Sequence, residues 1–135
     1  MEQKPFFLIT IDTEGDDLWS RSREITTENA RDMPRFQSLC EIYGLRPVYL
    51  VSYEMISDPA FKEFAKDILK RNKAEIGMHL HAWNTPPIIP LTADDFKFHP
   101  YMIEYPEEIM RKKVDTITSA LENTFGVRPV SHLNF

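Results

Sequence analysis

Ala74-Glu75-Ile76-Gly77-Met78-His79-Leu80-His81-Ala82-Trp83 is the segment with the strongest structural signal in this chain. Its apolar run predicts a strand over residues 75–81, and that strand ends in two histidines two positions apart. Side chains alternate between the faces of a strand, so His79 and His81 project from the same face. Two imidazoles side by side at the end of a strand are a good beginning for a metal site.

An earlier segment repeats this pattern with carboxylates. Phe6 to Ile11 is a continuous apolar run, as in strands buried on both faces of a sheet, and Asp12 and Glu14 follow it two positions apart. In parallel α/β folds the reactive groups gather at the carboxyl ends of the strands. We therefore expect two acids and two histidines at one edge of the sheet, which are residue types typical of hydrolytic metal sites.

A hydrolytic metal ion typically takes three protein ligands and keeps one position open for water. Imidazoles and one carboxylate suit Zn²⁺, and also Co²⁺, Ni²⁺, Mn²⁺ or Fe²⁺. A further carboxylate beside the bound water can accept its proton as a general base. The chemistry needs one acid as ligand and one as base, and the residues leave open which of Asp12 and Glu14 has which role.

Helices are expected between these strands. The first begins at Asp32 as N-cap, tolerates Pro34 in its first turn and ends at Gly44. Its apolar stripe, expected to be buried, is Phe36, Leu39, Cys40 and Tyr43.

The rest of the chain continues the alternation of strands and helices. A strand is expected over Val48–Val51, a helix from Asp58 and Pro59, and a further helix from Pro106 to Gly126. The apolar faces expected for these two helices are Phe61, Phe64, Ala65, Ile68 and Leu69, and Ile109, Val114, Ile117, Leu121 and Phe125. The alternation predicts an α/β fold of βα units around a parallel sheet.

One repeated segment extends this prediction to the end of the chain. Gly44-Leu45-Arg46-Pro47-Val48 recurs as Gly126-Val127-Arg128-Pro129-Val130, and each copy follows a predicted helix. A fourth strand is therefore expected from Pro129, and the sequence stops as that strand finishes at Phe135. The expected sheet would then have an exposed edge, as in an incomplete barrel.

Two long loops are expected at the same edge as the acids and histidines. The loop after His81 is rich in proline and long for an ordinary connection, which favours a functional role. Trp19 and Trp83, one in each loop, are candidates for stacking on a sugar ring, with core packing as the equal alternative. Asp16 and Asp17 are interpreted as solvated loop acids.

Composition limits the classes of protein and of partner. The 135 residues suffice for one domain or part of one, and a net charge of −5 argues against nucleic acid or an anionic membrane as partner. No apolar run approaches the ~20 residues of a membrane span, and the first residues do not form a signal peptide. A single cysteine excludes an intramolecular disulfide, and a cytoplasmic location is the default expectation.

These motifs resemble the polysaccharide deacetylase group (NodB homology, carbohydrate esterase family 4). Thr10-Ile11-Asp12-Thr13-Glu14 is similar to its first motif, and Glu75-Ile76-Gly77-Met78-His79-Leu80-His81 to its second, closest to a branch with Asp-x-Glu and His-x-His. The resemblance implies a partial, irregular (β/α) barrel and metal-dependent hydrolysis of N- or O-acetyl groups on a sugar polymer. It implies Asp12 as catalytic base, and Glu14, His79 and His81 as ligands of a divalent metal, Zn²⁺ first.

The departures from that group shape the remaining expectations. Residues 1–135 would form one incomplete domain, because the resemblance covers about the N-terminal half of the family domain and the third motif's arginine is replaced by Ser131-His132-Leu133-Asn134-Phe135. Weak activity, or none, is expected of such a chain. The alternative is a non-catalytic metal- or carbohydrate-binding half-domain completed by a second copy or a partner chain. Another barrel metallohydrolase, such as an amidohydrolase, fits the acidic first motif less well.

Overall fold

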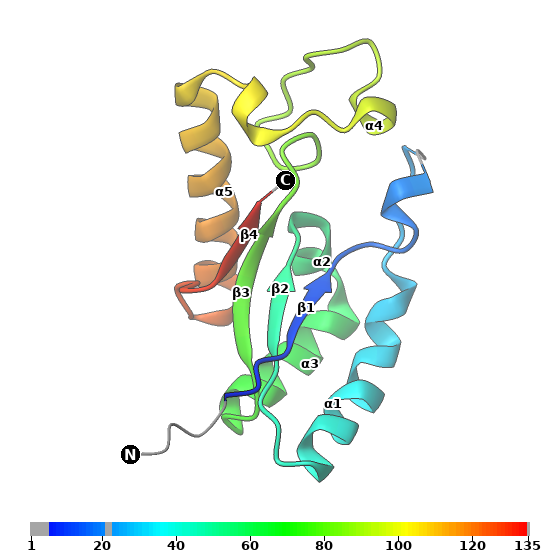
Figure 1. The fold of residues 1–135 in the computed structure, drawn as a ribbon, viewed down its shortest axis with the longest axis vertical. Helices are drawn as coiled ribbons and strands as arrows, with labels where there is room; N and C mark the ends of the chain where they lie inside the picture. Colours follow the sequence, from blue (N-terminus) through cyan, green and yellow to red (C-terminus); the bar gives the residue numbers. More distant parts are fainter. Residues whose placement is uncertain (1–5, 21–22, 135) are drawn as a thin grey trace.

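The computed structural model describes residues 6–20 and 23–134. Its centre is a parallel sheet with the strand order β1-β2-β3-β4, which follows the order of the chain (Figure 1). The strands are β1 Thr10–Thr13, β2 Val48–Val51, β3 Glu75–Leu80 and β4 His132–Asn134. The predicted parallel α/β architecture is confirmed, and the sheet curls into a half-barrel.

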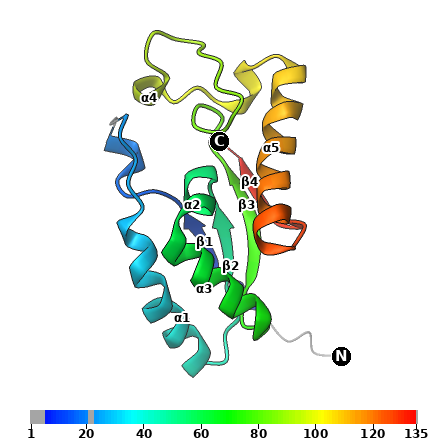
Figure 2. The same ribbon diagram turned by 180° about the vertical axis from the view of Figure 1, so that it is seen from behind.

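The helices, except the short one over residues 95–98 beyond the carboxyl ends of the strands, pack on one side of this sheet (Figure 2). They are α1 Met33–Ile42, α2 Tyr53–Ser57, α3 Pro59–Lys70, α4 Asp95–Phe98 and α5 Glu107–Phe125, with short 3₁₀ turns η1 Leu18–Ser20, η2 Glu28–Asp32 and η3 Met102–Glu104. Among the described residues, none of these helices combines the length and the apolar character needed to cross a membrane.

The hydrophobic core lies between the sheet and α3 and α5. The strands contribute the side chains that alternate toward the helices, and α3 and α5 contribute one apolar stripe each. The principal members are Tyr49, Val51, Ile76, Met78, Leu80, Phe61, Phe64, Ile68, Ile117 and Leu121, all buried. The stripes expected on α3 and α5 therefore face the sheet, because their spacing matches the helical repeat.

Helix ends follow the expected capping chemistry at several positions. The Asp58 carboxylate accepts a hydrogen bond from the Phe61 backbone N–H at 2.8 Å, which caps α3. Gly44 and Gly126 adopt φ of 67° and 70° after α1 and α5. The two repeated segments, 44–48 and 126–130, thus end their helices alike. The following strand begins at Val48 within the first copy, but only at His132, after the second copy.

The prediction that the first strand is buried on both faces was wrong. β1 begins only at Thr10, and Phe6, Phe7 and Leu8 before it are 101%, 77% and 71% exposed. β1 pairs only with β2, so it forms an edge of the described sheet. A strand needs neighbours on both sides and layers on both faces to be buried throughout, and these residues have neither.

The buried face of α1 also differs from the expectation. Gln37 and Cys40 are its buried residues, whereas Phe36, Leu39 and Tyr43 are exposed. Gln37 faces inward because its Oε1 accepts a hydrogen bond from the buried Tyr49 hydroxyl at 2.9 Å. A polar side chain with a buried hydrogen-bond partner therefore occupies the inner face of α1 in place of part of the apolar stripe. Hydrophobic periodicity cannot predict this orientation of the helix.

A buried lysine fixes the loop that follows β3. Lys113 on α5 is fully buried and donates hydrogen bonds to the carbonyl oxygens of Thr85 at 2.6 Å and Pro87 at 2.7 Å. Its Nζ lies 4.7 Å from the centre of the Tyr105 ring. Burial lowers the pKa of Lys113 to about 8. The proline-rich loop is therefore held against α5 at its start.

We expect Gly77→Ala to destabilise the protein. A Cβ at Gly77 would lie 2.6 Å from Leu50 Cδ2 and 2.7 Å from the Ser131 carbonyl oxygen, so strands must shift to admit it. Overpacking of this kind typically costs about 1–3 kcal/mol. Urea unfolding followed by circular dichroism measures the change. The control is Gly44→Asn, because the position is open and asparagine tolerates its left-handed backbone. Equal stabilities of Gly77→Ala and wild type would contradict the described packing of β2, β3 and β4.

Candidate metal centre

Glu14, His79 and His81 meet at the carboxyl ends of the strands. The Glu14 Oε2 atom lies 2.9 Å from Nε2 of His79 and 2.7 Å from Nε2 of His81. Both histidines are buried, with 0% and 1% exposure, and the Glu14 side chain is 20% exposed. Of all described residues that could hold a metal ion, these three form the group whose ligand atoms lie within 4.8 Å of one another. The expected convergence of the two strand ends is thus observed.

The register of the sheet explains how these side chains reach one face. Asp12 is level with Leu50 on β2, and Leu50 is level with Gly77 on β3. Glu14 and His79 follow Asp12 and Gly77 by two positions, so all four residues belong to the face opposite the helices. Asp12 is exposed on this face. The structure thus brings both acids and both histidines to one face, with Glu14 in contact with the imidazoles.

The electrostatics of Glu14 favour a charged carboxylate. Burial acts to raise its pKa, but the hydrogen bonds to His79 and His81 and the charge of the imidazoles outweigh burial and lower the pKa to about 2. Two imidazole nitrogens and one carboxylate oxygen are a donor set that suits Zn²⁺ and related divalent ions. The residues present therefore fit a divalent metal.

Neighbouring side chains orient Glu14. Its Oε1 accepts a hydrogen bond from the Trp19 indole N–H at 3.2 Å, and its carbonyl oxygen accepts one from Asn29 Nδ2 at 2.8 Å. Asp16 in turn accepts from the Asn29 backbone N–H at 2.9 Å and from the Thr26 hydroxyl at 3.0 Å. Asp16 is a partly exposed loop acid, and it also anchors the segment that follows Glu14, a role that the sequence interpretation did not include. Nothing in its local sequence identifies these partners.

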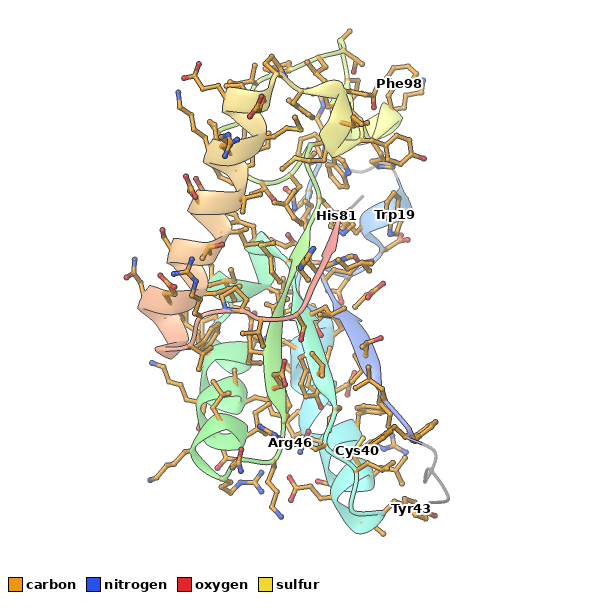
Figure 3. The ribbon with its side chains drawn as sticks, turned by 60° about the vertical axis from the view of Figure 1, so that its left-hand side comes forward. Trp19, Cys40, Tyr43, Arg46, His81 and Phe98 are labelled. Atoms are coloured by element: carbon orange, nitrogen blue, oxygen red, sulfur yellow. The ribbon has the colours of Figure 1, made fainter. Side chains whose placement is uncertain are left out.

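The two tryptophans lie beside the histidines but in different environments. Trp19 is 48% exposed and meets the ring of His81 edge-on, with the ring centres 5.3 Å apart. Figure 3 labels both side chains, which lie near each other at the ends of the strands. Trp83 is only 3% exposed and packs against His81 and His99. It also lines a cavity of 260 Å³ between residues 88–96 and Arg23. Trp83 therefore packs in the core, whereas Trp19 presents part of its ring to solvent.

Two further residues at this edge were not identified from the sequence. His99, in the loop after β3, packs its ring against Trp19 and Trp83 with centre distances of 4.8 and 4.7 Å. Glu54, in the first turn of α2, bonds to the segments that follow β1 and β3. Neither belongs to a motif with a fixed spacing, and their partners are distant in sequence, so only the tertiary structure identifies them.

Comparison with known proteins gives a fold and no close relative. No family model matches the sequence, and no curated protein sequence matches it either. Among solved structures, the chain is similar to a "putative polysaccharide deacetylase" from Mycobacterium smegmatis, with a TM-score of 0.59 and 17% identity. The alignment covers 93% of this chain and 41% of that protein. The fold is thus that of part of a polysaccharide-deacetylase-type α/β barrel, as the resemblance implied.

Glu14 should contribute stability that is lost in acid. Its folded pKa of about 2 lies below the ordinary 4.5, so the contribution is complete above pH 4.5 and disappears as the pH falls through 2. We expect the free energy of unfolding of wild type to fall by up to about 3 kcal/mol more than that of Glu14→Gln over this interval. Urea unfolding at a series of pH values measures it. Glu63→Gln, on the exposed surface of α3, should keep the wild-type pH dependence. If the free energy of unfolding depends on pH in the same way in Glu14→Gln and in wild type, the lowered pKa of Glu14 is contradicted.

Proposed function

We propose that this chain carries the metal centre of a carbohydrate deacetylase, a hydrolase that removes N- or O-acetyl groups from a sugar polymer. The observation that carries the proposal is the convergence of Glu14, His79 and His81 at the strand ends. The shared fold supports it, because the protein of that fold found among solved structures is described as a polysaccharide deacetylase. Metal-assisted hydrolysis needs this kind of donor set at an accessible edge of the sheet.

Glu14, His79 and His81 would hold the ion, with Zn²⁺ first and Co²⁺, Ni²⁺, Mn²⁺ or Fe²⁺ as alternatives. When bound, such an ion supplies Lewis acidity, which polarises the acetyl carbonyl and acidifies water. The Glu14 carboxylate is held by Trp19 on one oxygen and by the histidines on the other, which favours the role of ligand. With Glu14 as ligand, Asp12 is the acid that remains for proton transfer.

Asp12 would be the general base that accepts the proton of the attacking water. It lies on the same face of the sheet as Glu14, two positions earlier in the sequence, and its side chain is exposed to solvent. A general base must reach a water molecule at the reacting carbon, and an exposed carboxylate on the face that carries Glu14 and the histidines supports this role. Of the two acids, Asp12 therefore suits this role better than Glu14.

The two tryptophans would contribute to substrate binding in different ways. The half-exposed ring of Trp19 lies next to His81 and can stack on a sugar. Trp83 lies beneath it, with the two ring centres 6.3 Å apart, and would support Trp19 as well as line the neighbouring cavity. An acetylated carbohydrate is thus the substrate class that the surroundings of the site favour.

Metal binding and acetate release test this function. Wild type should bind about one Zn²⁺ per chain by calorimetry, and the His79→Ala/His81→Ala variant should bind none, because the two imidazoles supply most of the donor set. Asp12→Asn should retain the metal but lose roughly 10²–10⁴-fold in acetate release from acetylated chitooligosaccharides. Asp17→Asn, an exposed acid in the loop that follows β1, is the control for both measurements. A wild-type chain that binds no Zn²⁺ would overturn the proposed function.

We further propose that residues 1–135 are one part of a larger deacetylase-like domain, completed by further β/α units. The chain spans 41% of the matched protein, and β1 and β4 leave both edges of the described sheet open. Apolar residues are exposed beside β1 and on α1, namely Phe6, Phe7, Leu8, Phe36, Leu39, Ile42 and Tyr43. Phe36, Leu39 and Ile42 line one depression on the surface of α1, and an exposed apolar surface of this kind is typical of a face that another part of the structure covers.

The isolated chain should therefore show the behaviour of an uncovered apolar surface. We expect it to bind a hydrophobic dye and to self-associate in light scattering, and Leu39→Glu/Ile42→Glu to reduce both without lowering the free energy of unfolding. Both residues are more than half exposed, so the charges need not enter the core. The control is Ile103→Glu, which is 85% exposed on η3, away from α1. A monomer with no dye binding would argue that no further unit covers this face.

A further inference from the structure

Glu54 connects the segments that leave three neighbouring strands. Its Oε1 accepts hydrogen bonds from the Gly15 backbone N–H at 2.9 Å and the Ser52 hydroxyl at 2.5 Å. Its Oε2 accepts one from Asn84 Nδ2 at 2.7 Å. Gly15 follows β1, Ser52 follows β2 and Asn84 follows β3. One side chain therefore joins the carboxyl ends of three strands.

The residues joined by Glu54 are adjacent to the metal-binding group. Gly15 follows Glu14 directly, and Asn84 lies three positions after His81. β1 and β3 are not paired with each other, because β2 lies between them. The ladders of β1 with β2 and of β2 with β3 end at Thr13 and Met78, before Glu14 and the histidines, so no backbone hydrogen bond of the described sheet joins the Glu14 segment directly to β3. Glu54 supplies a direct connection beyond the end of the ladder.

A carboxylate is well suited to this position. All three partners are hydrogen-bond donors, and a carboxylate can accept from all of them without donating. Gly15 approaches closely because it has no side chain: a Cβ there would lie 2.9 Å from the Thr26 carbonyl oxygen and 3.4 Å from Glu54 Oε1. Ser52 is 1% exposed, so its hydroxyl depends on protein partners.

We infer that Glu54 is a positioning residue that sets the separation between Glu14 and the two histidines, and thereby the affinity of the site for its metal. The inference rests on the proposed metal centre. Glu54 acts through Gly15 and Asn84 and does not itself supply a ligand. Residues that orient metal ligands from outside the ligand set typically change affinity by about 10–100-fold.

The test compares two substitutions of Glu54. Glu54→Ala removes every acceptor and should weaken Zn²⁺ binding by about 10–100-fold in calorimetry. Glu54→Gln keeps an oxygen for Gly15 and Ser52, and its amide can pair with that of Asn84 after a side-chain flip, so it should stay within roughly threefold of wild type. Rescue by glutamine is a result that a general loss of stability would not give.

A second variant separates positioning from stability. Gly126→Ala should destabilise the fold through its left-handed backbone at the far end of α5, yet leave Zn²⁺ affinity unchanged in the folded protein. Glu63→Ala, on the exposed side of α3, controls for the loss of a carboxylate. If Gly126→Ala weakens binding as much as Glu54→Ala does, or if Glu54→Ala binds Zn²⁺ like wild type, the inference is overturned.

A metal-free measurement keeps this inference distinct from the proposed function. In ¹⁵N-labelled protein without metal, Glu54→Ala should speed hydrogen exchange of the Gly15 amide and shift the Trp19 indole resonance, which reports its bond to Glu14. Glu54→Gln should restore both signals. If the wild type binds no Zn²⁺ while Glu54→Ala still changes both signals, the metal centre is overturned and Glu54 is supported as the residue that positions Glu14. Unchanged signals in Glu54→Ala would overturn the positioning role.

Discussion

The contact between the Glu14 carboxylate and the two buried imidazoles is the interaction on which the site depends. Two histidines without access to solvent need a hydrogen-bond partner, and one carboxylate oxygen meets both of their Nε2 atoms. The same oxygen brings negative charge to the place where a divalent cation would lie. The contact that satisfies the buried imidazoles is thus also the one on which the proposed metal site rests.

The scaffold reaches this arrangement through β2, the strand that contributes none of the three residues. β2 holds β1 and β3 in register, so Asp12 and Gly77 lie level on either side of Leu50. Beyond the last backbone hydrogen bonds of the sheet, side chains hold the segments that follow the strands. Asn29, Trp19 and Glu54 fix the segment around Glu14, and Lys113 holds the start of the loop after β3.

The described sheet is open on both sides, and this openness shapes the surface of the chain. Apolar side chains that precede β1 or lie along α1 remain exposed, whereas the core between the sheet and α3 and α5 is closed. Asp12, on the edge strand β1, is exposed as well, whereas Leu50 and His79 on the same face of the inner strands are buried. The contact of Glu14 with the two histidines forms within the described residues, since strand pairing and local hydrogen bonds produce it.

Local patterns in the sequence were enough for the alternation of strands and helices, the bounds of β2, and the common face of His79 and His81. Each of these depends on residues close in sequence, whose spacing follows the repeat of a strand or a helix. The meeting of Glu14 with the histidines was also expected, because parallel strands end at one edge. The buried side of α1, the exposure of Phe6 to Leu8, and the roles of Asp16, Glu54 and Lys113 could not be foreseen. They depend on which groups from other parts of the chain lie opposite, and hydrogen bonds between residues 10 to 39 positions apart do not follow the repeat of a helix or a strand.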